Sequence, residues 1–136
     1  MKSTTVTLNT GRTRTVVDIT HHAAEFVGGE GDGLLNVFVP HATAGVAIIE
    51  TRSGTEDDLL NSIERLLPVD DAFYRHRHGA EGHGGDHVLP AWISPSTVVP
   101  VIDGRLALGT WQSIVLVDPN KDNPTRTIRF SLLPSS

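Results

Sequence analysis

The sequence contains no cysteine, and this absence excludes several kinds of site. Disulfide bonds, thiolate nucleophiles and cysteine-based zinc sites all need that side chain. We also find no Ser-His-Asp pattern typical of a hydrolase nucleophile. Histidine, aspartate and glutamate are therefore the side chains that remain for holding a metal ion.

Long apolar runs and basic runs are absent as well. No segment approaches the roughly 18 apolar residues of a membrane span, and the first ten residues lack the apolar stretch of a signal peptide. Eleven basic against sixteen acidic residues give a net charge of −5, which argues against nucleic acid and membrane as partners. The chain of 136 residues is expected to form one cytoplasmic domain, residues 1–136, with a single core.

Runs of β-branched and apolar residues predict most of the strands. Residues 4–8 and 14–19 are separated by turn residues and are expected to pair as a hairpin. Residues 34–39 form a continuous apolar run, which is typical of a central strand. Further strands are expected over residues 46–49, 88–93 and 127–133.

A second hairpin is predicted from residues 97–102 and 110–117, which flank a turn at Asp103-Gly104. Thr110, Trp111 and Gln112 then stand inside a predicted core strand. Buried polar side chains need partners, so these residues indicate either an internal hydrogen-bond network or the wall of a pocket.

Two helices are predicted. The first begins at Thr20 and ends at Gly28-Gly29. The second begins at Thr55, has three acidic residues in its first turn and continues with leucine and isoleucine at helical spacing as far as Pro68. Residues 68–85 show no periodicity, and a loop of this length is usually functional or mobile.

Histidines are the main chemical signal. His76, His78, His83 and His87 lie within one short stretch, and His41 lies between two predicted core strands. Neutral imidazole is a common metal ligand and also moves protons near neutral pH. His83 and His87 would share one face of a helix, but the two glycines between them argue against a helix there. A polar surface loop that is merely rich in histidine is the alternative to a binding site.

Other polar residues also allow two interpretations. Glu50 ends a buried strand and is either a general base or metal ligand, or a carboxylate that faces water. Arg126 and Arg129 flank the last strand, where they would clamp a phosphate or pair with acidic groups. Trp111 is either a core residue or a surface on which a ring stacks.

A family resemblance covers nearly the whole chain. Residues 96–114, with the sequence Gly109-Thr110-Trp111-Gln112, resemble the signature of the YjbQ-like family, and residues 41–46 followed by Glu50 resemble its His-Thr-Thr-Ala connection. The resemblance implies an α+β domain of antiparallel, sandwich-like sheets with two short helices. It also implies a homotrimer with polar pockets and a relation to secondary thiamine-phosphate synthases.

The resemblance also suggests where the site lies. It implies catalytic roles for His41, Glu50 and Gln112 and a divalent metal, Zn or Mg, held by His41, His76 and His87. With the chemistry of the residues, it indicates Thr43, Thr110, Trp111 and Arg126 as substrate contacts. The chain departs from the family pattern at Ala42, at Ile49 and around Gly84-Gly85, and these departures concern the substrate more than the fold.

Two functions from different classes follow. The first is a metal-assisted transferase that joins a pyrimidine pyrophosphate to a thiazole phosphate and releases pyrophosphate. The second is a trimer that binds a metal ion or a small phosphorylated metabolite without turnover. A purely structural role for Gln112 and its neighbours at a trimer interface is a third interpretation.

Overall fold

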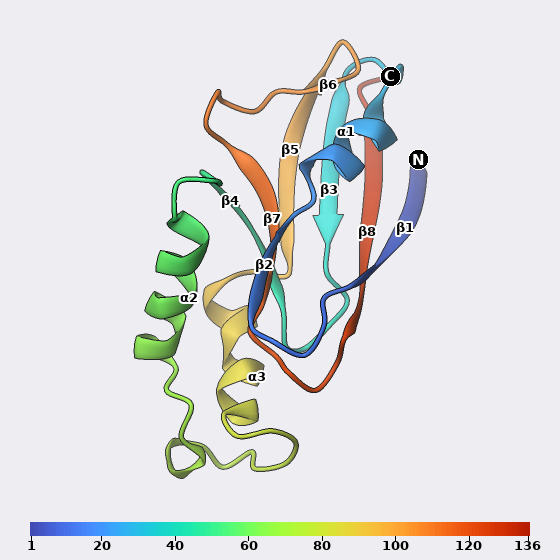
Figure 1. The fold of residues 1–136 in the computed structure, drawn as a ribbon. Coiled ribbons are helices and arrows are strands. Elements are labelled where there is room, and N and C mark those ends of the chain that lie inside the picture. Colours follow the sequence, from blue (N-terminus) through green and yellow to red (C-terminus); the bar gives the residue numbers. More distant parts are fainter.

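A computed structural model describes residues 1–136 as two packed antiparallel sheets with two of the helices on one side (Figure 1). The five-stranded sheet has the order β1 (Lys2–Asn9), β8 (Thr125–Pro134), β3 (Gly33–Phe38), β5 (Ser96–Ile102) and β6 (Arg105–Leu106). The three-stranded sheet has the order β2 (Thr15–Asp18), β7 (Ser113–Asp118) and β4 (Gly45–Ile49). The helices are α1 (Thr20–Val27), α2 (Thr55–Leu66), the 3₁₀ turn η1 (Asp71–Phe73) and α3 (His83–Trp92).

Strand β7 shows how the layers are held together. Ile114 and Leu116 belong to the main core with residues of the five-stranded sheet, whereas Val115 and Val117 pack against side chains of α2 and α3. Because side chains alternate along a strand, a strand buried on both faces must be apolar throughout. The layer order is therefore the five-stranded sheet, the three-stranded sheet and then α2 and α3, and Figure 1 shows these two helices on the side away from β1 and β8. Helix α1 packs into the main core instead, through Ala23, Phe26 and Val27. The predicted α+β class with antiparallel sheets is confirmed.

The predicted N-terminal hairpin is wrong. Strand β1 pairs with β8, with Val6 opposite Ile128, whereas β2 pairs with β7 in the other sheet. The residues between β1 and β2 do not form a hairpin turn. They contact the segment before β8 instead, where the Thr10 backbone N–H donates to Pro124 O at 2.7 Å. Burial of each strand against its own sheet therefore decides the pairing, and closeness along the chain does not.

The second predicted hairpin is also wrong, because residues 97–102 and 110–117 do not pair with each other. Asp103 and Gly104 form the expected turn, with φ of 50° and 72°, but β5 returns into the short strand β6. The chain then crosses to the other sheet, where β7 lies between β2 and β4. Thr110, Trp111 and Gln112 belong to this crossing segment and are exposed, so they are not residues of a core strand.

A third helix forms where the end of the predicted loop, residues 68–85, and a predicted strand were expected. Helix α3 runs from His83 to Trp92 and has Ile93 as its C-cap residue, so the predicted strand over residues 88–93 is wrong. Helix α2 begins at Thr55 as expected, although Gly54 with φ of 90° is its N-cap residue. None of the helices has both the length and the apolar character that crossing a bilayer requires.

Candidate metal centre

Helix α3 and the segment before it bring three imidazoles together. The potential ligand atoms of His76, His83 and His87 all lie within 4.8 Å of one another. His83 and His87 are one helical turn apart, and their Nε2 atoms are 2.9 Å from each other. Nitrogen atoms converging in this way can hold one transition-metal ion between them.

Glycine allows this approach. A Cβ atom on Gly84 would lie 2.5 Å from the His76 carbonyl oxygen and 2.6 Å from Tyr74 Cβ, and a Cβ on Gly85 would lie 2.7 Å from the Tyr74 hydroxyl oxygen. Residues 74–76 therefore pack directly on the backbone of α3. The two glycines that argued against a helix are required for the helix to meet His76.

The orientation of His83 is set by a carboxylate. His83 Nδ1 donates to Asp122 Oδ2 at 2.7 Å, so in the neutral ring the lone pair of Nε2 faces His87 Nε2, where it can bind a metal. Asp122 also accepts from the Ala80 backbone N–H at 2.9 Å. Burial alone would raise the pKa of Asp122, but the hydrogen bonds from Ala80 and His83 lower it instead. The pair resembles the carboxylate–histidine pairs that support metal sites.

A buried polar layer lies behind α3. Asn120 Nδ2 donates to Asp86 Oδ2 at 3.0 Å, and Arg14 Nη2 lies 3.5 Å from Asp86 Oδ1. Burial raises the pKa of Asp86 to about 6. Arg14 Nε and Nη1 are buried without a hydrogen-bond partner. This layer fixes the first turn of α3 against the loop that follows β7.

Two imidazoles of the cluster, those of His76 and His87, favour their neutral forms. Desolvation lowers the pKa of His76 and of His87, and neighbouring histidines lower both pKa values further. Metal ligation needs the neutral imidazole, so the lowered pKa values of these two side chains favour metal binding. The ring of His78 is 4.1 Å from that of His76, but His78 is not one of the three converging ligands.

Other predicted site residues lie elsewhere. Arg126 is 1% exposed and donates from Nε and Nη2 to Asp118 at 2.9 and 2.8 Å and from Nη2 to Thr43 Oγ1 at 2.9 Å. The structure does not place Arg126 or the buried Thr43 where a dissolved phosphate reaches them. His41 Nε2 accepts from the Thr127 backbone N–H at 2.9 Å, and His41 is not part of the histidine cluster.

A separate pocket contains the remaining predicted residues. Glu50, Thr110 and Trp111 line one cavity together with residues of the β4–α2 loop. Gln112 lies beside it, and its Oε1 accepts from the Gly109 backbone N–H at 2.8 Å. The predicted site is therefore divided among three places in the chain.

Two residues of the cluster are not among the predicted site residues: His83, one of the three converging imidazoles, and Asp122, its hydrogen-bond partner. The spacing of His83 and His87 is a signal for the first, but the glycines between them argue against the helix that it needs. For Asp122 there was no local signal, because 39 residues separate it from His83.

His41 gives a prediction about pH. Desolvation, followed by the nearby Arg126, lowers the pKa of His41 from 6.5. Its stabilising hydrogen bond is therefore complete above pH 6.5 and is lost as the pH falls through the folded-state pKa. We expect His41→Ala to lower the free energy of unfolding by about 1–3 kcal/mol at neutral pH, with a smaller difference near about pH 5. Urea unfolding at both pH values measures this, and an equal or larger difference at the lower pH would contradict it.

The fold and the cluster together define a class: a small two-sheet α+β protein with a histidine-bearing helix at one end. Residues 4–135 match the family model described as "UPF0047 protein YjbQ-like". The UPF0047 protein Rv2556c of Mycobacterium tuberculosis (strain ATCC 25618 / H37Rv) is 55% identical over 133 residues, covering 98% of each chain. YugU of Bacillus subtilis (strain 168), also a UPF0047 protein, is 30% identical over 133 residues, covering 95% of this chain and 97% of YugU.

A solved structure agrees with these relatives. The hypothetical protein APE1520 from Aeropyrum pernix K1 superposes with a TM-score of 0.84 at 33% identity, covering 99% of this chain and 100% of that one. The chain belongs to the UPF0047 (YjbQ-like) family. The resemblance expected from the Gly-Thr-Trp-Gln segment is thus confirmed.

Proposed function

We propose that this chain binds a divalent transition-metal ion through His76, His83 and His87, and that the metal site acts on a phosphorylated metabolite. The observation that supports this most directly is the convergence of three imidazole ligand atoms within 4.8 Å. The hydrogen bond from His83 to Asp122 supports it independently, because it points the free nitrogen of His83 toward His87.

The donor set favours zinc or a similar ion over magnesium. Imidazole nitrogen suits Zn²⁺ and other transition metals, whereas Mg²⁺ prefers oxygen ligands. Zinc sites with three protein ligands are typical of catalysis, because water or substrate occupies the remaining position. When bound, such an ion supplies positive charge that stabilises a phosphate or pyrophosphate group.

The reaction that we propose follows from the family resemblance. In a thiamine-phosphate synthase reaction, the bond from the pyrimidine methylene carbon to pyrophosphate breaks, and the thiazole nitrogen bonds to that carbon. Pyrophosphate leaves with the electron pair. The exposure of His76 and His87 supports access by a substrate of this size.

Pyrophosphate release tests the transferase proposal. Metal-loaded protein supplied with both substrates is expected to release pyrophosphate, and His83→Ala to lose this activity. His21→Ala is the matched control, since His21 is an exposed histidine on α1 outside the cluster. Release that is equal in the His83→Ala protein would refute the proposed site.

The second function, binding without turnover, is favoured by the lack of a nucleophile beside the histidines. It predicts that metal raises the melting temperature of the natural protein while no pyrophosphate forms. Melting curves and the release assay on the same preparations separate the two functions.

We propose in addition that the chain assembles as a homotrimer through the outer face of the five-stranded sheet. Large apolar side chains are exposed on this face from three adjacent strands, where proteins that remain monomeric rarely expose so much contiguous apolar surface. They are Leu34, Phe38, Val98, Ile102 and Leu133.

This assembly gives a further prediction. Val98 is 52% exposed in the single chain, so Val98→Glu is expected to leave the monomer folded while placing a charge in the interface, converting trimer to monomer. Leu66→Glu is the control, because Leu66 is exposed on α2. Light scattering after size-exclusion chromatography measures the mass. A trimeric Val98→Glu protein would show that this face is not the interface.

A further inference from the structure

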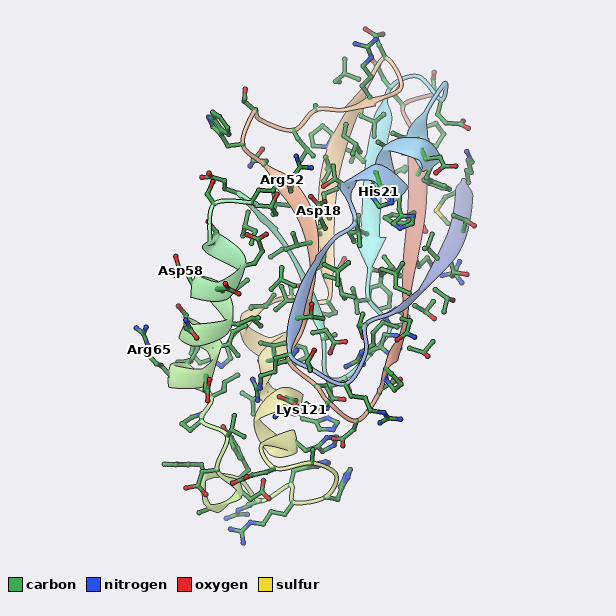
Figure 2. The ribbon with its side chains drawn as sticks, viewed as in Figure 1. Asp18, His21, Arg52, Asp58, Arg65 and Lys121 are labelled. Carbon is green, nitrogen blue, oxygen red and sulfur yellow. The ribbon has the colours of Figure 1, made fainter.

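The polar pocket lined by Glu50, Thr110 and Trp111 lies at the N-terminal end of α2. The histidine cluster lies toward the opposite end of this helix. The volume of the pocket is about 330 Å³, which suits a small metabolite. It forms because β4 and β7 pair with Ile49 opposite Ser113, so that the loop after β4 meets the segment before β7. The 12 residues of α2 separate its two ends by about 18 Å, and Figure 2 shows Arg52 and Arg65 near opposite ends of this helix.

The cavity contains two opposite charges that do not neutralise each other. Glu50 and Arg52 both line it, yet neither side chain takes part in any ion pair of the structure. The rest of the lining is four hydroxyl side chains and one indole. A ligand that matches this lining carries a hydrogen-bond donor for Glu50 and an acidic group for Arg52.

The backbone at Arg52 is held in an unusual conformation. Its φ of 72° lies in the left-handed region, which Asp103 alone among the other non-glycine residues shares, and Asp103 belongs to a hairpin turn. This conformation is unfavourable for a residue with a Cβ. The Arg52 backbone N–H donates to both carboxylate oxygens of Glu56 at 3.1 Å. These bonds fix the backbone of Arg52 at the edge of the cavity that this residue lines.

Trp111 is the one hydrophobic residue that lines the cavity. It is 74% exposed, although tryptophan normally buries most of its large area. Its indole is thus available for a planar ring to stack on it. A ring, an acidic group and an amino group are then all matched by residues of one pocket.

We propose that this pocket binds an amphoteric aromatic metabolite, with the ring on Trp111, the acidic group on Arg52 and an amino group on Glu50. The proposal goes beyond the metal function and requires none of the histidines. The acidic group is either a phosphate or a carboxylate, since a guanidinium binds both through paired hydrogen bonds.

Tryptophan fluorescence tests this binding. The chain has two tryptophans, so a Trp92→Phe background leaves Trp111 as the only emitter. Two probes distinguish the acidic groups: cytidine 5′-monophosphate, an aminated ring with phosphate, and L-phenylalanine, a ring with a carboxylate and an amine. At least one is expected to quench Trp111 saturably at millimolar concentration, and cytidine or inorganic phosphate alone to bind more weakly.

Matched variants locate the binding. Arg52→Gln is expected to weaken the active probe by about tenfold or more, and Glu50→Gln to weaken it as well. Arg65→Gln, which changes an exposed arginine at the other end of α2, is expected to leave the titration unchanged. Saturable quenching by neither probe, or equal affinity in the Arg52→Gln and Arg65→Gln proteins, would overturn the proposal. His83→Ala should leave the fluorescence titration unchanged. Failure of the proposed metal site and failure of this pocket can therefore be distinguished.

Discussion

Replacing Arg126 with methionine is expected to lower the free energy of unfolding by about 3–5 kcal/mol. Arg126 and Asp118 form an ion pair in which both side chains are 1% exposed. Without the guanidinium, Asp118 keeps hydrogen bonds from Thr10 Oγ1 and the Asn120 backbone N–H, but its buried charge has no counterpart. An uncompensated buried carboxylate is among the most destabilising single changes in a folded protein.

Urea unfolding measures this effect against a matched arginine. Arg129 is exposed on the same strand and donates to Ser3 Oγ, so Arg129→Met is expected to change stability by no more than about 0.5 kcal/mol. Removing both charges with Asp118→Leu and Arg126→Met is expected to recover most of the loss, since a buried pair can often be replaced by apolar residues. Equal effects of Arg126→Met and Arg129→Met would contradict the structural role that we assign to Arg126.

Replacing Asp122 with alanine is expected to weaken zinc binding by about 10–100-fold. The change removes the acceptor that holds His83 Nδ1 at 2.7 Å, so the ring can turn and the wrong nitrogen can carry the proton. The ligand atoms themselves are untouched. The effect should therefore appear as weaker affinity, with binding of one ion per chain still reached at high zinc concentration.

Competition with a chromophoric zinc chelator measures the affinity of the Asp122→Ala protein. Asp57→Ala is the control, because Asp57 is an exposed aspartate on α2 and should leave zinc affinity unchanged. If the two variants bind zinc equally well, Asp122 does not orient a metal ligand.

The sequence predicts where most strands and helices lie better than it predicts which strands pair with each other. The apolar run of residues 34–39 identified β3, which does lie between two strands of its sheet, and the leucine spacing identified α2. Strand pairing failed because β-propensity is local, whereas pairing depends on which faces are buried together over more than 100 residues, as for β1 and β8.

The histidine cluster is only partly evident from the sequence, for a related reason. Histidine spacing points to the region in which the structure brings three imidazoles together, but the low helix propensity of Gly84 and Gly85 argues against the helix that carries two of them. The role of these glycines is steric, because they admit Tyr74 and the His76 carbonyl against the helix backbone. Propensity is a weak prior that tertiary contacts override, and no sequence pattern reveals such a contact.

The residues that the family resemblance implies for one site do not lie together in this structure, and their roles stay predictions. His41, Glu50 and His87 belong to three separate surroundings in this chain: a buried ion-pair network, a polar pocket and the histidine cluster. Position along the sequence cannot show this division, because it arises from the crossing of the chain between two sheets.

Elemental analysis of tag-free protein purified without added metal, alongside its His83→Ala, His87→Ala and His41→Ala variants, tests the central claim most directly. We expect about one transition-metal ion per chain in the natural protein, as a three-histidine site predicts, loss of the ion in the first two variants and retention in His41→Ala. Absence of metal from the natural protein even after reloading, or equal metal content in the His83→Ala variant, would contradict the proposed metal centre.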